Sequence, residues 1–151
     1  MNEQRWAPRA TVATVVYDGD SYLIVEELSS DSNETVFNQP AGHLEPDESL
    51  SEAAVREVRE ETGWEVVLTG YLGVARHITE NGTVYLRHSF VAEPIGPIYG
   101  AALDDGIIAA HWLTLEQLKQ QHARLRSPMV LKTIEQFLSG DIGSLSLVAN
   151  A

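Results

Sequence analysis

Runs rich in β-branched and aromatic residues alternate along the chain with runs whose apolar residues recur at helical spacing. The first kind predicts strands, which we place at residues 10–17, 22–27, 36–39, 65–79, 83–93 and 107–113. The second kind predicts helices, at residues 115–121 and 128–139 and in the segment that follows Ser49. Residues 141–151 are small and weakly apolar and are left unassigned.

The helix after Ser49 has the clearest boundaries. Ser49 and Glu52 stand three residues apart, which is the spacing of a capping box at a helix N-terminus. Its apolar stripe consists of Leu50, Ala54 and Val58. A glycine at position 63 favours the end of the helix there.

Turn residues separate the remaining runs. Residues 18–20, Asp-Gly-Asp, predict a hairpin between the first two strands, and Asn81-Gly82 is the strongest short hairpin signal in the chain. Residues 94–106, with two Pro and three Gly, predict a loop. Neither a repeat nor a linker interrupts residues 1–151. The expectation is therefore one α/β domain with a mixed sheet and helices on both faces.

Composition narrows the class of protein. At 151 residues and 44% apolar, the chain suits one compact domain with an ordinary core. The net charge is −12 and the Lys and Arg residues are scattered, which disfavours stable nucleic-acid binding. The lack of cysteine excludes disulfides and thiolate chemistry. The sequence has neither a signal peptide nor an apolar run of membrane length, so we expect a cytoplasmic protein, as a monomer or a homodimer.

Three carboxylates then suggest a chemistry. Glu57, Glu60 and Glu61 stand at i, i+3 and i+4 of the predicted helix and share one face. Because they repel one another, the arrangement favours a site for a hard divalent cation such as Mg²⁺, completed by substrate phosphates and water. The alternative is a solvated acidic face that pairs with Arg56 and Arg59. The first hypothesis is a metal-dependent enzyme acting on a phosphorylated small molecule.

The helix belongs to a longer motif. The motif begins with Gly and has Glu after five intervening residues. After seven more residues it continues as Arg-Glu-hydrophobic-any-Glu-Glu-any-Gly-hydrophobic. The chain matches at Gly42, Glu48 and residues 56–64, with Trp64 where an aliphatic residue is usual. This pattern resembles the Nudix box. The resemblance implies an α/β/α sandwich that hydrolyses nucleoside diphosphates linked to another moiety, with Mg²⁺ or with Mn²⁺ in its place.

Two flanking phrases are similar to those of a bacterial Nudix subgroup. They are residues 37–45, Phe-Asn-Gln-Pro-Ala-Gly-His-Leu-Glu, and residues 125–128, Leu-Arg-Ser-Pro. That subgroup releases orthophosphate from nucleoside tri- and diphosphates and from hydroxymethylpyrimidine pyrophosphate, a thiamine precursor. The similarity runs from about residue 11 to residue 140 and implies the same class of substrate.

The resemblance also implies roles for box residues. It assigns the catalytic metals to Glu57, Glu60 and Glu61, with the backbone carbonyl of Gly42 as a further ligand. It makes Arg56 and Glu48 orienting residues that hold the ligating helix.

The implied reaction is attack of metal-activated water on phosphorus, with one carboxylate as general base. The sequence does not separate Glu57 from Glu61 for that role. Some family members recruit the base from the loop before the last strand, where Asp104 stands. Asp104 is therefore a further ligand or base, or simply a solvated turn residue.

The sequence gives fewer signals for the residues that contact the substrate. A two-residue turn at positions 81 and 82 would place Arg76 opposite Arg87, and like charges that face each other favour a phosphate clamp. Neighbouring Glu residues or a shifted register are the alternatives. Tyr85 would stack on a base or pack in the sheet, and His43 would touch a phosphate. Arg126 lies at the start of the last helix, where backbone donors hold anions.

Two other functions compete with this reading. Hydrolases of ADP-ribose or dinucleoside polyphosphates share the fold, but the ADP-sugar type carries a proline about sixteen residues beyond the box, and residues 79–81 contain none. A nucleotide-binding module without hydrolysis commonly loses box glutamates, and all of them are present here.

Overall fold

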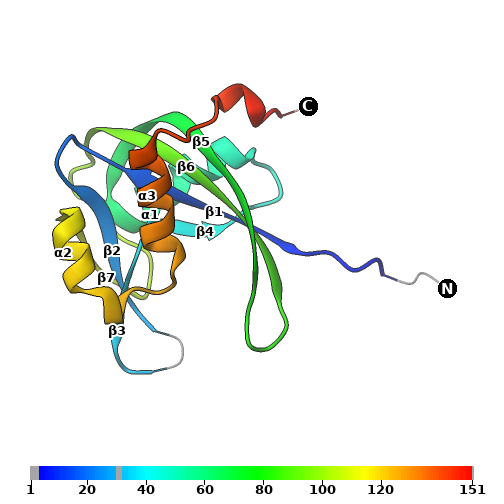
Figure 1. Cartoon of the computed structure of the whole chain (residues 1–151), viewed down its shortest axis with the longest axis horizontal. Coiled ribbons are helices and arrows are strands. Elements are labelled where there is room, and N and C mark those ends of the chain that lie inside the picture. The colour runs from blue at the N-terminus through cyan, green and yellow to red at the C-terminus, as the bar shows by residue number, and fades with distance from the viewer. Residues whose placement is uncertain (1–3, 30–31, 151) are drawn as a thin grey trace.

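The computed structural model describes residues 4–29 and 32–150, which form two β-sheets with helices on both sides (Figure 1). The elements follow in the order β1 (Arg9–Val16), β2 (Tyr22–Leu28), β3 (Thr35–Asn38), β4 (Ala41–His43), α1 (Leu50–Thr62), β5 (Trp64–Ile78), β6 (Val84–Pro97), β7 (Ile107–Leu113), α2 (Leu115–Gln120), η1 (His122–Arg124), α3 (Met129–Ser139) and η2 (Leu145–Leu147). Within the described residues, no helix is long and apolar enough to cross a membrane.

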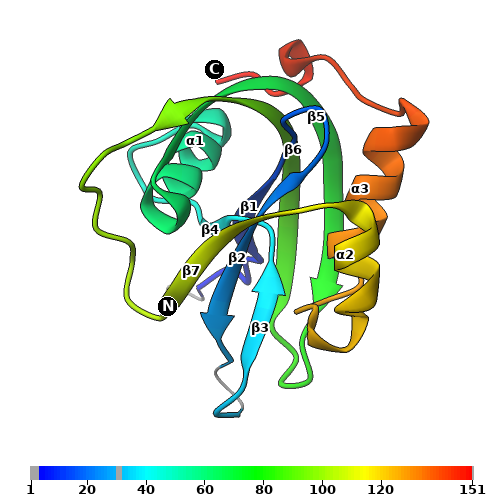
Figure 2. The same ribbon diagram turned by 90° about the vertical axis from the view of Figure 1, so that its left-hand side faces the viewer.

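One sheet is mixed and the other antiparallel. The first has the order β4-β1-β6-β5, in which β1 and β6 are parallel, and the second has the order β3-β2-β7. Figure 2 shows the strands between α1 on one side and α2 and α3 on the other. The predicted α/β class with a mixed sheet is thereby confirmed.

Adjacent side chains of β2 serve the two helical layers. Leu23 packs in a cluster with Val58 of α1, while Ile24 packs with Leu118 of α2 and Ile134 of α3. All five side chains are at most 1% exposed, and burying one such side chain contributes about 1.5–3 kcal/mol. This alternation along β2 ties the sheets and both helical layers into one core.

Helix α1 begins and ends where the sequence predicts. The Ser49 side chain accepts a hydrogen bond from the backbone N of Glu52, and the Glu52 side chain accepts one from the backbone N of Ser49. Gly63 ends the helix with φ +72°, a left-handed conformation that favours glycine. Ala54 and Val58 are fully buried, as the stripe predicts, and Leu50 is partly buried. These caps fix the rotation of the helix and therefore the direction of its carboxylates.

The predicted hairpin between the first two strands is wrong. The turn forms, with Asp18 N donating to Ser21 O at 3.2 Å. However, Tyr17 and Tyr22 make one isolated bridge, and the two strands then join different sheets. The reason is that β4 and β6 occupy the edges of β1, whereas β3 and β7 occupy those of β2.

The register of the β5–β6 hairpin also differs from the prediction. Arg76 pairs with Leu86, and Arg87 pairs with Ala75, so the two arginines do not face each other. The chain turns through three residues, 80–82, and Gly82 takes the left-handed position with φ +84°. A three-residue loop shifts the pairing by one residue and moves alternate side chains to the other face. The facing-arginine clamp is therefore incorrect.

Two smaller corrections concern prolines. Residues 94–97 extend β6 instead of starting the loop, because β1 ends at Val16, opposite Ala92, and leaves one edge of β6 unpaired. Proline is tolerated at such an edge because it lacks the N–H that a ladder needs. Pro40 does interrupt β3, but the chain resumes as the short strand β4, which the sequence did not predict.

The C-terminal segment that the sequence left unassigned contains η2 and a bridge between Tyr71 and Gly143.

Candidate active site

Arg56 connects the acidic residues around α1. Its Nε and Nη2 donate to both carboxylate oxygens of Glu48 at 2.8 and 2.7 Å. Its Nη1 donates to Glu57 at 2.9 Å and to Glu60 at 3.0 Å, and Nη2 also reaches the carbonyl oxygen of His43 at 2.9 Å. The guanidinium lowers the pKa of Glu48 and fixes the box loop against the helix.

A third acidic residue joins this face from the loop before β7. Carboxylate oxygens of Glu57, Glu60 and Asp104 lie within 4.8 Å of one another, and we call this group the carboxylate cluster. Asp104 is brought there by the chain itself, because its backbone N donates to the carbonyl oxygen of Glu60 at 3.0 Å. Burial raises the pKa of Glu57, and burial and Glu60 raise the pKa of Asp104. A set of hard oxygen donors with too little positive charge suits a divalent cation.

Glu61 is not one of the three residues of the carboxylate cluster. Its side chain is 8% exposed and accepts a hydrogen bond from the backbone N of Ala41 at 2.8 Å. Burial raises its pKa to about 8, and the nearby carboxylates of Glu57 and Glu27 act in the same direction. Its roles as metal ligand and general base stay predictions, and a pKa near neutrality suits proton transfer.

Gly42 lies directly against the carboxylate cluster. A Cβ at this position would stand 2.2 Å from the carboxylate of Glu57, so a larger residue would displace that side chain. The short strand β4 holds Gly42 opposite Val12 of β1. The close approach explains the need for glycine at the first box position, while its carbonyl as a metal ligand stays a prediction.

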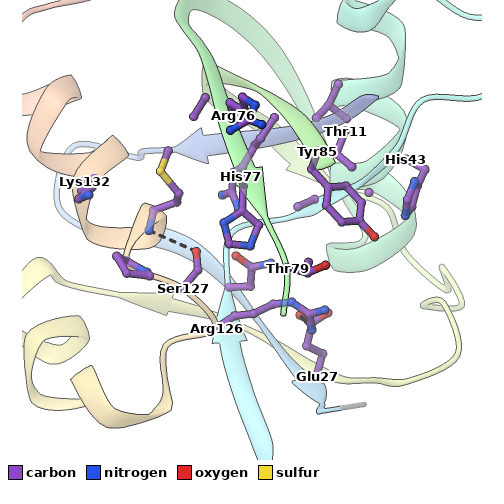
Figure 3. Close-up of a pocket in the computed structure, with 18 residues that line it drawn as sticks. Thr11, Glu27, His43, Arg76, His77, Thr79, Tyr85, Arg126, Ser127 and Lys132 are labelled. Atoms are coloured by element: carbon purple, nitrogen blue, oxygen red, sulfur yellow. Dashed lines mark hydrogen bonds and ion pairs between the residues drawn. The ribbon is translucent and has the colours of Figure 1, made fainter. Parts of the chain in front are cut away.

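Gly42 also lines a cleft of about 510 Å³, which Figure 3 shows in close-up. It lies between the two sheets and the start of α3. Its walls are lined by Thr11, Val12, Glu27, Asn38, Ala41, Gly42, His43, Ala75, Arg76, His77, Thr79, Tyr85, Arg87, Arg126, Ser127, Pro128, Met129 and Lys132.

The cleft gathers positive charge in an otherwise acidic protein. Among the described lining residues are four cationic side chains and one carboxylate, Glu27; the four are Arg76, Arg87, Arg126 and Lys132. Arg126 donates to Glu27 at 2.9 Å. Burial, together with the nearby charge of Arg126, lowers the pKa of Arg87 to about 10. Cations held this close favour an anionic ligand between or beside them.

The two subgroup phrases meet at one wall of this cleft. Arg126 N donates to the carbonyl oxygen of Phe37 at 2.9 Å, and Phe37 also forms a bridge with Leu125. Gln39 then reaches α3, where its Nε2 donates to the carbonyl oxygen of Val130 at 2.9 Å. Segments nearly 90 residues apart in sequence thus form one surface.

All five residues predicted to bind substrate line the cleft, namely Arg76, Arg87, His43, Tyr85 and Arg126. The rings of His43 and Tyr85 lie 5.9 Å apart, and Figure 3 shows both on the same side. Their contacts with a substrate stay predictions.

Sequence reasoning missed Glu27, Lys132 and Asn38 as site residues. Lys132 stands one helical turn after Pro128, with its N donating to the Pro128 carbonyl oxygen at 3.2 Å, so the second phrase pointed toward it. Asn38 was part of the first phrase. Glu27 had no signal, because a β-bulge after Glu26 shifts the strand register there.

Comparisons with known proteins agree with this geometry. Residues 7–132 match the model of the NUDIX domain family. The chain is 35% identical over 143 residues to the phosphatase NudJ of Escherichia coli K12, which covers 95% of this chain and 92% of NudJ. NudJ of Shigella flexneri matches equally well.

Solved structures agree as well. A NUDIX hydrolase from Nitrosomonas europaea superposes with a TM-score of 0.91 at 36% identity, over 96% of this chain and 98% of that one. The MutT NUDIX hydrolase from Burkholderia pseudomallei has a TM-score of 0.72 at 22% identity, over 87% and 98%, and so shares the fold. The box, the two-sheet architecture and these relatives show that the chain belongs to the Nudix family of hydrolases.

Proposed function

We propose that this enzyme is a metal-dependent phosphatase that cleaves phosphoanhydride bonds in nucleoside tri- and diphosphates or in hydroxymethylpyrimidine pyrophosphate. One observation carries the proposal: the carboxylate cluster adjoins a cation-lined cleft at Gly42. A substrate with its phosphates near Gly42 would meet acidic metal ligands on one side and basic side chains on the other.

The carboxylate cluster fits Mg²⁺ or Mn²⁺. Glu57, Glu60 and Asp104 would hold the cation, with Glu61 and the carbonyl of Gly42 as further donors. A bound divalent cation lowers the pKa of water and offsets charge on phosphoryl oxygens. Among the described residues, Arg56 is the one cation that donates to both Glu57 and Glu60, so the cluster retains excess negative charge that such a cation would balance.

The protein's own residues supply the rest of the reaction. Water attacks phosphorus, its proton passes to the carboxylate of Glu61 or Glu57, and the bond from phosphorus to the bridging oxygen breaks as phosphate is released. The raised pKa of both carboxylates supports this proton transfer. Arg126 and Lys132 add positive charge to the cleft, which favours an anionic substrate, while Arg56 and Glu48 keep the helix and the box loop in place.

The proposed substrates fit both the relatives and the cleft. NudJ, of which this chain covers 92%, is named a phosphatase. A cleft of about 510 Å³ is in the range of small-molecule sites, which are roughly 300–1,000 Å³.

The decisive experiment measures the products that the purified protein releases with Mg²⁺. The substrates are GTP, GDP, hydroxymethylpyrimidine pyrophosphate, ADP-ribose and a dinucleoside polyphosphate, with orthophosphate resolved from pyrophosphate. We expect orthophosphate from the first three and none after Glu60→Gln. Turnover confined to ADP-ribose or the dinucleotide would overturn the proposed substrate class, and an unaffected Glu60→Gln variant would overturn the metal site.

A further inference from the structure

Two buried polar atoms in the cleft wall have no protein partner. Counting only described residues, three buried side-chain atoms make no hydrogen bond, namely Asn38 Oδ1, Arg87 Nε and Thr14 Oγ1. Asn38 and Arg87 both line the cleft, whereas Thr14 does not. A buried polar atom without a partner costs about 1–3 kcal/mol. The fold therefore leaves one acceptor and one donor of the cleft-lining residues unsatisfied, at a cost to stability.

Both side chains are held in place by the fold. Arg87 Nη2 donates to Gln39 Oε1 at 2.8 Å, and Gln39 is itself fixed by Thr133 Oγ1 at 2.9 Å and by the carbonyl oxygen of Val130. Asn38 ends β3, where it pairs with Val25, and its side chain is 6% exposed. Neither group can turn to solvent without disturbing this packing, so the pair is preorganised for a ligand.

The chemistry of the pair selects its ligand. Arg87 Nε–H requires an acceptor, and Asn38 Oδ1 requires a donor. Ionised phosphoryl oxygens only accept, so a phosphate would leave Asn38 Oδ1 unsatisfied and repelled. The edge of a nitrogen heterocycle presents an N–H beside a ring nitrogen or carbonyl oxygen, and so offers the donor and the acceptor that these atoms require.

We propose that Asn38 and Arg87 bind the heterocycle of the substrate, a nucleobase or an aminopyrimidine, and thereby determine specificity. This inference rests on the proposed function and adds an orientation to it. Arg87 and His43 both pair with Thr11, from β6 and β4 on either side of β1. Two strand spacings, about 10 Å, thus separate the heterocycle end from the His43 and Gly42 end, where the phosphates would lie.

The test compares substrates that differ only in the base. Nucleoside diphosphates and hydroxymethylpyrimidine pyrophosphate are assayed beside ribose 5-diphosphate, which retains sugar and phosphates without a heterocycle. For Asn38→Leu we expect kcat/KM to fall about 10- to 100-fold for the preferred heterocyclic substrate. For ribose 5-diphosphate we expect a change below about twofold. Asn38→Asp retains the acceptor and should keep most of the base preference.

Thr14→Val is the matched control, because Thr14 Oγ1 is also buried without a partner within the described chain but lies outside the cleft wall. It should leave the base preference unchanged. An equal loss on both substrate types in Asn38→Leu would overturn the inference, and so would no loss on either.

A binding measurement separates this inference from the proposed hydrolysis. Free nucleosides, titrated by NMR into the metal-free protein, carry a heterocycle and no phosphate. Chemical shift changes at residues around Asn38, weakened in Asn38→Leu, would support the inference even if no substrate is turned over. Binding that persists unchanged in Asn38→Leu would overturn it whatever the activity.

Discussion

The carboxylate cluster takes two of its three side chains from one helix, α1, whereas the cleft beside it is walled by residues of β1 to β6 and α3. Their electrostatics differ as much as their construction. Burial raises the pKa of Glu57 in the cluster and lowers the pKa of Arg87 in the cleft. Each region holds charge of one sign that is unfavourable when buried alone. The two regions therefore have opposite electrostatic requirements, which the proposed metal and phosphorylated substrate would meet.

The strongest way to break this comparison is to remove charge from the cluster. Glu57→Gln should lower kcat about 10²- to 10⁴-fold, because the residue is both a proposed metal ligand and a candidate base. Steady-state phosphate release with Mg²⁺ measures the effect. Glu135→Gln, at an exposed position of α3, is the control and should leave kcat unchanged. Comparable activity in the two variants would contradict the assignment.

A second change tests how tightly the two regions adjoin. Gly42→Ala places a Cβ 2.2 Å from the Glu57 carboxylate, so we expect at least about a tenfold loss of activity and a loss of about 1–3 kcal/mol in the free energy of unfolding. Urea denaturation and a phosphate assay measure the two effects. Gly96→Ala is matched, because a Cβ there meets no atom within 4 Å. Equal behaviour of the two variants would show that contact with Glu57 is unimportant.

The pH dependence of stability tests the acidic residues of the comparison, through Glu61. Burial raises the pKa of Glu61 from 4.5 to about 8, so between these values the folded protein holds a proton that the unfolded chain releases. In chelator, the free energy of unfolding should therefore fall as pH rises through this window, by at most about 1.4 kcal/mol per pH unit for this group. Urea midpoints at several pH values measure the slope. Glu61→Gln should flatten it, and an unchanged slope in that variant would contradict the assignment.

The smallest effect on activity is expected from a change in the cation-lined cleft. Arg126 is exposed and already paired with Glu27, so Arg126→Gln should raise KM only up to about fivefold, with little change in kcat. The increase should shrink at high salt because the interaction is screened. Arg5→Gln, exposed and outside the cleft wall, controls for net charge. A large loss of kcat would instead place Arg126 at the reacting phosphorus.

The same contrast explains what the sequence could predict. The caps and carboxylate spacing of α1 lie within about fifteen consecutive residues, so local rules were sufficient for them. The predicted pairing of Arg76 with Arg87 was wrong because Asn81-Gly82 fits either a two- or a three-residue turn. A register shift of one residue places the partner side chain on the other face of the sheet. The free atoms of Asn38 and Arg87 depend on distant residues of β3, β6 and α3, and no local pattern records them.

The segment between β6 and β7 is hydrogen-bonded at two points to the C-terminal end of α1. Ile98 N donates to the Gly63 carbonyl oxygen at 2.7 Å, and Asp104 N donates to that of Glu60. Between these anchors the chain bulges outward, with Tyr99 93% exposed. Insertions after Gly100 would lengthen this bulge without moving Asp104. Natural variation in length, or an inserted epitope or fluorophore attachment site, could be accommodated beside the carboxylate cluster while leaving the position of Asp104 unchanged.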